Sequence, residues 1–206
     1  YVRMADSTRS LLIDRELNTP RSAVDWALRE ILDVASSEVA EVEIIHPDGD
    51  WVLVAKSSPA DTDFTLNSLP EDRVISSSWS VNALGGALSG LKLDDVVKAQ
   101  AMTSEELVRF RLLTFAGVEY MLQAWDNDAG SWVSVEASVP AVEDQAKPGI
   151  VMGEAVSPDP HATAEAVNQR LAGWYYRVPA HKFDLLTKRS ESLLQPLEAS
   201  ESADRE

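Results

Sequence analysis

The sequence predicts an α+β fold with antiparallel sheets built from hairpins and a meander, packed by about four helices. Three observations predict this class. Apolar runs flank Asp48-Gly49, alternating stretches follow one another between residues 107 and 139, and several other stretches carry apolar residues three or four positions apart. Strands joined by short turns pair antiparallel, so these stretches indicate hairpins and not a parallel sheet.

Residues 1–100 are predicted to form a helix-hairpin-helix-strand unit. A short strand is expected at 9–15, followed by a helix over 18–34 in which Thr19 can cap and Pro20 suits the first turn. One apolar stripe of this helix would hold Val24, Ala27, Leu28, Ile31 and Leu32.

The hairpin of this unit is expected at the Asp48-Gly49 turn, between strands near 41–46 and 51–56, because Asp-Gly suits tight hairpin turns. The stretch 63–69 should extend the same sheet. From Trp79 the apolar spacing becomes helical, and a strand at 92–99 ends the unit. The apolar positions of that second helix are Val81, Leu84, Leu88 and Leu91.

Residues 101–197 are predicted to form a strand meander plus two C-terminal helices, packed with the first unit as one globular body. The strands are expected at 107–115, 118–126 and 131–139, and 140–160 reads as a long loop. Asp159 can cap a helix whose inner face would end at Trp174. A strand at 174–178 and a helix over 180–194 follow, and 198–206 reads as a disordered acidic tail.

Composition excludes several classes of function. The net charge is −16, with 34 acidic and 18 basic residues, so a phosphate backbone would be repelled and nucleic acid is not an expected partner. Eight of the acids lie between Glu41 and Asp72 against Lys56 alone, which indicates a solvated acidic face. There is no cysteine, and no apolar run reaches the roughly 18 residues that span a membrane.

No catalytic, cofactor-binding or metal-binding set of residues emerges. His46, His161 and His181 are scattered, and each is expected to be an exposed polar residue or a helix start. Ser89 lies in a predicted helix and not in a nucleophile elbow. Asp126 and Asp128 resemble the start of a calcium loop, but the twelfth position is Ala137, so a hairpin turn is the better interpretation.

The aromatic and basic stretch 171–194 has two interpretations. As the closing segment of the fold, it would bury Trp174 and one of the two tyrosines that follow, and leave its lysines and arginine in solvent. As a binding surface, it would expose the aromatic residues. The first interpretation is favoured. A candidate interaction surface is assigned more broadly to four tryptophans and two basic residues: Trp51, Trp79, Trp125, Trp132, Lys188 and Arg189.

Five segments together resemble the DUF4340 family of bacterial proteins: residues 17–44, 46–56, 63–73, 81–96 and 171–194. Each motif is only helix and strand patterning, and it is their order and spacing that resemble the family. The resemblance implies an extracytoplasmic, membrane-anchored protein whose anchor and a similar upstream unit lie outside this chain. It also implies association with ABC-type export systems of the gliding-motility kind, and it supplies no catalytic residue.

The sequence therefore predicts a non-enzymatic extracytoplasmic accessory domain of an ABC transport system, in protein–protein contact with its membrane subunits or auxiliary proteins. The alternative is a module that binds an envelope glycan or another small ligand on exposed tryptophans. A hydrolase is the third hypothesis. Coplanar exposed tryptophans along a groove would favour the glycan module, and buried ones would favour the accessory domain.

Overall fold

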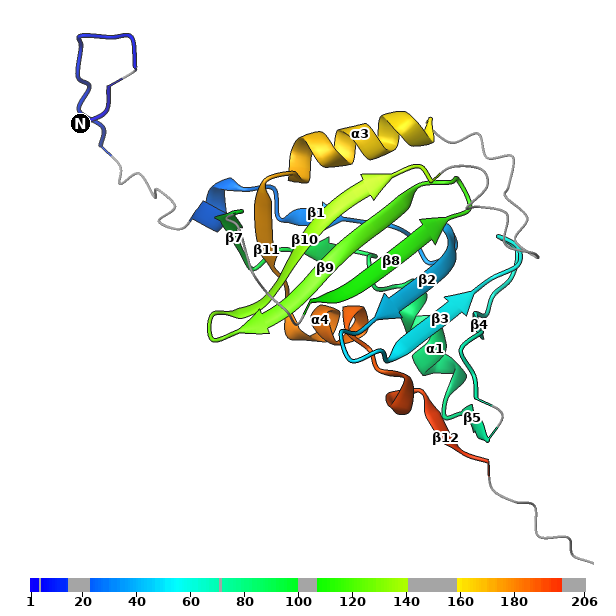
Figure 1. Ribbon diagram of the computed structural model, residues 1–206. Helices are drawn as coiled ribbons and strands as arrows, with labels where there is room; N and C mark the ends of the chain where they lie inside the picture. The colour runs from blue at the N-terminus through cyan, green and yellow to red at the C-terminus, as the bar shows by residue number, and fades with distance from the viewer. Residues whose placement is uncertain (4, 15–22, 71, 100–106, 141–158, 198–206) are drawn as a thin grey trace, which may run out of the picture.

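A computed structural model describes residues 1–3, 5–14, 23–70, 72–99, 107–140 and 159–197. Its centre is an eight-stranded antiparallel sheet with the strand order β4-β3-β2-β8-β9-β10-β11-β7 (Figure 1). These strands are β2 Val39–Ile45, β3 Trp51–Ala55, β4 Thr65–Leu66, β7 Asp95–Lys98, β8 Val108–Thr114, β9 Glu119–Asn127, β10 Gly130–Ser138 and β11 Trp174–Arg177.

Helices and two small sheets surround this central sheet. The elements are the 3-10 helices η1 Ala23–Trp26 and η2 Ser190–Ser192, the helices α1 Ser78–Gly85, α3 Pro160–Leu171 and α4 Ala180–Leu186, and the strand pairs β1 Glu30–Leu32 with β6 Leu91–Lys92 and β5 Arg73–Ile75 with β12 Leu194–Pro196. The fold is thus α+β with antiparallel sheets, as predicted. The described residues contain three α-helices, and the expected number of about four is slightly too high.

The predicted hairpin and meander are confirmed. β2 and β3 pair antiparallel with Ile45 opposite Trp51, and Gly49 in the turn has a φ of 89°, which favours glycine. β8, β9 and β10 follow one another as an antiparallel meander. Local turn chemistry therefore sets the middle of the sheet.

Both predicted segments contribute to this one sheet. β2, β3 and β4 come from residues 1–100 and pair with the meander through β8. β7 also comes from residues 1–100, but it lies at the opposite end of the sheet and pairs with β11, whose residues are 174–177. The chain therefore crosses the molecule between β4 and β7, and the β11–β7 end is built from two distant stretches.

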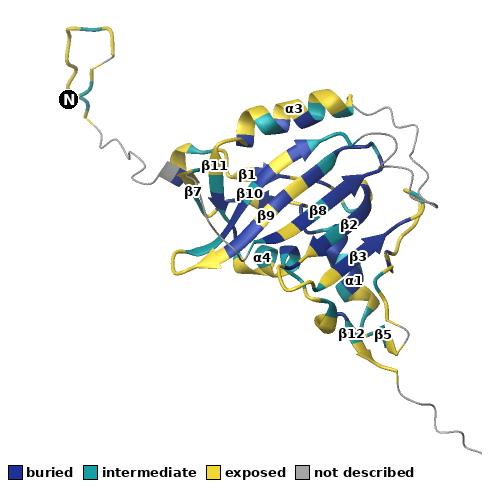
Figure 2. Ribbon diagram, in the orientation of Figure 1, coloured by how far each residue is buried: buried dark blue, intermediate teal, exposed yellow. Residues whose placement is uncertain are grey.

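The core lies on one face of the sheet. Along β8 and β9 buried and exposed residues alternate, as Figure 2 shows. The inward residues meet α1, α4 and the β1–β6 pair (Figure 1). Large side chains with almost no solvent exposure come from all of these elements: Ile31, Ile44, Leu84, Leu88, Phe110, Leu112, Leu122, Leu186 and Leu193.

The helix predicted over residues 18–34 is wrong in its described part. Residues 23–26 form a single 3-10 turn, and Glu30–Leu32 is a strand that pairs with β6. The backbone N–H of Leu93 donates to the carbonyl of Arg29, which extends this pairing. The stabilisation from pairing with β6, about sixty residues away, outweighs the weak helix propensity of this stretch. As a result Leu28, expected on the buried stripe, is 80% exposed.

The last helix is shorter than predicted. It ends at Leu186, and the chain continues through η2 into β12 instead of running as a helix to residue 194. The tip of the β2–β3 hairpin holds the non-helical part: Arg189 pairs with Asp48 at 2.7 Å, and the Ser190 hydroxyl donates to Asp50. The predicted loop at 140–160 and tail at 198–206 lie almost wholly outside the described residues.

The acidic run is not simply a solvated face. Glu41 is 2% exposed, and Arg111 of β8 donates to it at 2.6 Å and to Glu119 of β9. Burial by itself would lower the pKa of Arg111, but its hydrogen bonds to Glu119 and Glu41 raise that pKa above its usual value. The guanidinium therefore stays charged and joins β2, β8 and β9 on the face opposite the core.

Replacing this cation should be costly. We expect Arg111→Met to lower the free energy of unfolding by about 3–5 kcal/mol, because it removes the cation shared by two carboxylates with little solvent exposure. Arg109→Met, two residues away and exposed on the same strand, should cost less than about 0.5 kcal/mol. Urea unfolding of both variants measures the difference, and equal losses would contradict this role of Arg111.

Candidate functional site

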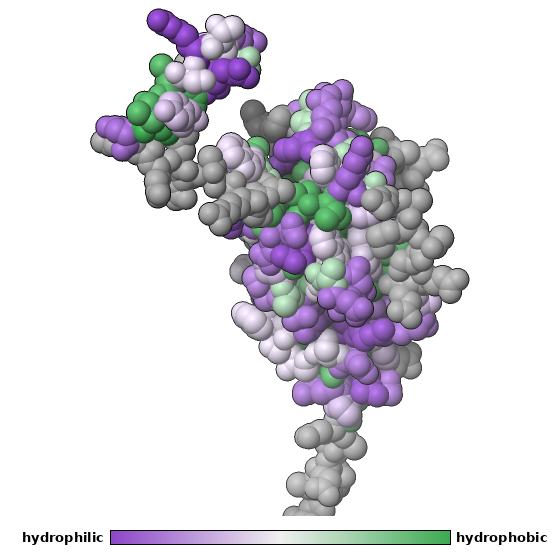
Figure 3. All heavy atoms as spheres, turned by 90° about the vertical axis from the view of Figure 1, so that its left-hand side faces the viewer, coloured by the Kyte–Doolittle hydropathy of each residue, from purple (hydrophilic) through white to green (hydrophobic). Residues whose placement is uncertain are grey.

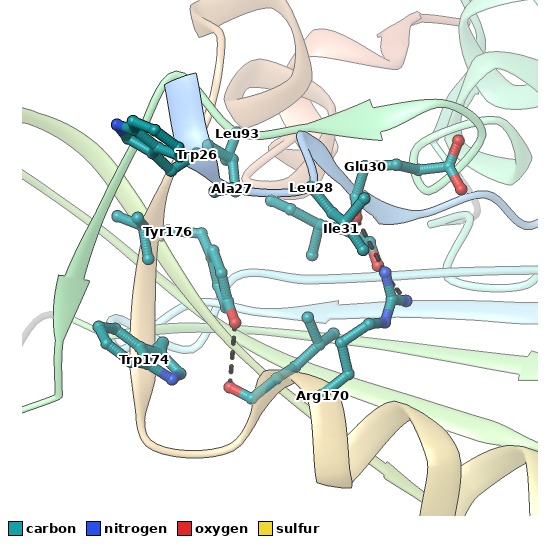
Figure 4. A pocket seen from close by; sticks show the side chains of 11 residues that line it. Trp26, Ala27, Leu28, Glu30, Ile31, Leu93, Arg170, Trp174 and Tyr176 are labelled. Carbon is teal, nitrogen blue, oxygen red and sulfur yellow. Dashed lines mark hydrogen bonds between the residues drawn. The ribbon is translucent and has the colours of Figure 1, made fainter. Parts of the chain in front are cut away.

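An apolar cleft opens at the β11–β7 end of the sheet, with a volume of about 400 Å³. Buried residues of the core form its floor, namely Ile31, Leu171 and Tyr176. Exposed residues form its rim, namely Trp26, Leu28 and Trp174. Figure 4 shows these side chains around one space, and we call this set of residues the apolar cleft.

The floor is held in place by the turn between α3 and β11. Gly173 has a φ of 82°, which allows the chain to reverse directly after the helix. Trp174 and Tyr176 are two residues apart in β11 and so lie on the same face. The Tyr176 hydroxyl donates to the carbonyl of Leu171, and burial raises the pKa of Tyr176, opposed by the charge of Arg170. Tyr176 is therefore a neutral, fixed part of the floor.

Arg170 ties the opposite wall to the same helix. Its guanidinium donates to the carbonyl of Glu30 at 2.9 Å and to that of Ile31 at 2.7 Å (Figure 4). Because Glu30 and Ile31 belong to β1, the segment that follows Trp26 and Leu28 is fixed against α3. The floor and this wall of the cleft are therefore built before any ligand arrives.

The rim is unusually exposed for its residue types. Leu28 is 80% exposed, Trp26 72% and Trp174 43%. The prediction that Trp174 is largely buried is wrong, whereas the burial of one of the two tyrosines, Tyr176, is confirmed. Figure 3 shows hydrophobic residues gathered at the centre of this side of the molecule, surrounded by hydrophilic ones. An exposed apolar patch with a polar border is typical of a contact site.

The six residues assigned to an interaction surface do not lie in the cleft. Trp51 and Trp79 are exposed, on β3 and α1, whereas Trp125 and Trp132 are buried opposite each other on β9 and β10. Trp125 also meets Tyr175 edge-on, with ring centroids 4.9 Å apart. Two of these four tryptophans therefore cannot serve as open stacking platforms.

A second, more polar pocket of about 300 Å³ brings together some of these residues. Trp125 and Arg189 line it with His46, and the Lys188 carbonyl lies 3.4 Å from the His46 Nε2 atom. His46 is buried, so its expected exposure is wrong. Arg189 is exposed and partly neutralised by Asp48, whose pKa it lowers. This pocket joins the hairpin tip to the C-terminal segment, which indicates a structural role.

Charged residues are sparse in the lining of the apolar cleft. In the described residues there is no group of three or more histidine, aspartate or glutamate side chains that could hold a metal ion. Glu30 and Arg170 are the charged residues among those that line the apolar cleft, and the Arg170 guanidinium is bound to two carbonyl groups. The lining of the cleft is therefore mainly apolar, which is typical of a binding site.

Lys182 was expected in solvent and instead caps a helix. Its ammonium group donates to the carbonyls of Gly86, Ala87 and Ser89 just after α1, at 3.1, 3.2 and 2.6 Å. Burial lowers the pKa of Lys182, opposed by Asp33. A cation near a helix C-terminus is favoured by the helix dipole, and this one binds the turn that directly follows α1. The basic residues of 171–194 are therefore largely structural.

Comparisons with protein families, with characterised proteins and with solved structures found no match to this chain. No helix in the described part of the chain is long and apolar enough to cross a membrane. The geometry of the chain itself therefore carries the functional argument.

Sequence reasoning missed all three rim residues, since Trp174 was expected in the core. Trp26 and Leu28 were placed in a helix, where a tryptophan and a leucine near an apolar stripe indicate core. In the structure that stretch is a 3-10 turn followed by a strand. Trp26 and Leu28 therefore do not lie on the buried face of a helix. The exposure of Trp26 and Leu28 results from the pairing of β1 with β6, and nothing in the neighbouring sequence indicates it.

The capping role of Lys182 can be tested directly. We expect Lys182→Met to lower the free energy of unfolding by about 1.5–3 kcal/mol, since hydrogen bonds from a charged donor are worth about that much. Lys188→Met should cost less than about 0.5 kcal/mol, because no hydrogen bond or ion pair of its side chain is found among the described residues. A loss for Lys188→Met as large as that for Lys182→Met in urea unfolding would disprove the assignment.

Truncation of the rim should be mild. Trp174→Ala removes a side chain that is only partly buried, so we expect a loss of about 1–2 kcal/mol instead of the 3–5 kcal/mol typical of a core tryptophan. Leu186→Ala, at a position with no exposure, should cost about 2–5 kcal/mol. If thermal and urea unfolding showed the opposite order, Trp174 would belong to the core.

Proposed function

We propose that this domain is a non-enzymatic binding domain that acts by contact with another protein through the apolar cleft. The observation that carries the proposal is the rim: Trp26, Leu28 and Trp174 remain exposed beside a floor that Arg170 and Tyr176 hold rigid. Tryptophan, tyrosine and arginine are the residue types that dominate the energy of protein interfaces. A preformed floor lowers the entropy cost of binding.

A protein partner fits this geometry better than a small ligand does. A molecule that filled only the 400 Å³ cavity would touch the floor, but it would not by itself cover a leucine that projects outward with 80% exposure. A protein surface can cover floor and rim together, and burial of apolar area is worth about 25 cal/mol per Å². The buried pair Trp125 and Trp132 gives no support to a glycan platform.

The setting of this contact is proposed from the family resemblance alone. We propose that the domain lies on the extracytoplasmic side, joined to a membrane anchor outside this chain. Its partner is then a membrane subunit or auxiliary protein of an ABC-type transport system. The cleft supports the contact itself, and the resemblance supplies the class of partner.

Site-specific photocrosslinking in cells that produce the full-length protein tests this function. A photoreactive residue at position 28 or 174 should form an adduct with a subunit of a transport system, because both positions border the cleft. The matched control is position 79, where Trp79 is 78% exposed but lies on α1. Adducts absent from positions 28 and 174, or identical from position 79, would rule out the cleft as the contact site.

A further inference from the structure

We propose that the partner segment is an extended strand that adds to the free side of β7 and places every second side chain in the apolar cleft. This inference rests on the proposed function and names the form of the partner. A peptide that adds to a sheet edge gains main-chain hydrogen bonds for affinity and side-chain pockets for specificity. Both parts of such a site lie together here.

The first part is the edge itself. β7 is the last strand of the central sheet, and β11 is its one strand partner in the described residues. The N–H of Ala99 donates to the carbonyl of Gly173, so Val97 and Asp95, in step with Ala99, also direct their backbone groups to β11. Val96 and Lys98 therefore direct their N–H and C=O groups away from the sheet.

A hydrogen bond within β7 confirms that direction. The N–H of Val96 donates to the side chain of Asp95, its own neighbour, at 2.9 Å. A sheet edge that is left open invites unwanted pairing, and a carboxylate that occupies one donor is a means of blocking it. Asp95 therefore competes with an incoming strand for the Val96 N–H and holds the edge partly closed.

The second part is the position of the cleft on this edge. Val96 lines the cleft, and opposite it in β11 lies Tyr176, which forms the floor. A strand added about 4.8 Å beyond β7 would carry alternate side chains on the same face as Val96. Trp26 and Trp174 stand one at either end of this side of the cavity, as Figure 4 shows. Apolar side chains at every second position of the new strand would lie between them.

The net charge of the chain favours basic residues at the other positions of the partner strand. The net charge is −16, so a segment with basic residues between its apolar ones would be attracted and oriented before contact. The occupant is therefore an extended segment of a partner protein in which apolar and basic residues alternate. A second copy of this chain, which shares the same charge, is disfavoured.

The test uses a fluorescein-labelled nine-residue peptide of alternating lysine and leucine, with a block isomer of the same composition as control. We expect the alternating peptide to bind at least tenfold more tightly, measured by fluorescence anisotropy. Two further peptides carry N-methyl groups on all leucine amides or on all lysine amides. Since alternate N–H groups of a strand point to opposite sides, one of the two should lose binding and the other should retain it.

Hydrogen exchange locates the peptide on the protein. Saturation with the alternating peptide should slow exchange of the Lys98 amide at least tenfold, because that N–H faces the free side of β7. The amide of Asp128, in the β9–β10 turn, should not change. This readout needs no variant and so does not depend on the stability of a mutant.

Two matched pairs of variants separate the cleft from the edge. Leu28→Asp should lower affinity at least tenfold, whereas Trp79→Asp, at an equally exposed position outside the cleft, should not. Asp95→Ala should raise affinity about fivefold, since it frees the Val96 N–H and a typical hydrogen bond is worth about 1 kcal/mol. Asp94→Ala, next to it and exposed, should leave affinity unchanged.

The outcomes are distinguishable from those of the proposed function. Binding that depends on Leu28 but leaves the Lys98 amide unprotected, or that tolerates both N-methyl patterns, would refute strand addition and leave the cleft as a contact site. No binding of the alternating peptide, or concentration-dependent dimerisation that competes with it, would also overturn the inference. Crosslinks from positions 28 and 174 report on the proposed function independently.

Discussion

The whole arrangement depends on the need to cover one face of the central sheet. Phe110, Leu112 and Leu122 project from the meander, and a row of this size cannot remain in water. The cover is supplied by elements from both ends of the sequence: the β1–β6 pair, α1, α4 and Leu193 near η2. That cover thins at β11 and β7, where Ile31 and Tyr176 come close to the surface. The apolar cleft is a part of the core that the described residues leave uncovered.

Long polar side chains compensate for the short, irregular elements of the cover. Arg170 and Lys182 each donate to two or more backbone carbonyls of segments over ninety residues away in the sequence. Asp48 and Asp50 hold the C-terminal segment by accepting hydrogen bonds from Arg189 and from the Ser190 N–H. Some of these contacts pair polar groups that are partly buried, such as the carbonyl of Ile31 and the N–H of Ser190. Many charged residues that the sequence suggests are solvated therefore hold these segments in place.

The sequence predicted those parts of the fold that are determined by residues close together in the chain. The turn at Gly49 and the alternation of β8, β9 and β10 are determined by neighbouring residues, and so is the cap of α3, where Asp159 accepts from the His161 N–H. The parts it did not reveal have distant causes. Glu30–Leu32 is a strand because β6 lies beside it, and Trp174 is 43% exposed on the rim of a cleft whose walls come from distant parts of the sequence. The edge of β7 likewise becomes visible only when its partner is known to be β11.

The contact between the hairpin tip and the C-terminal segment has a consequence for the order of folding during synthesis. Residues 46–50 hold residues 188–190, which are about 140 positions later in the sequence. A ribosome can release the β2–β3 hairpin and the meander long before Leu186 and Leu193 are available to seal the core. The nascent chain must therefore present an unsealed sheet face between the synthesis of β10, which ends at Ser138, and that of Leu193. During that interval the exposed apolar face is prone to aggregation, and a chaperone would have its largest effect.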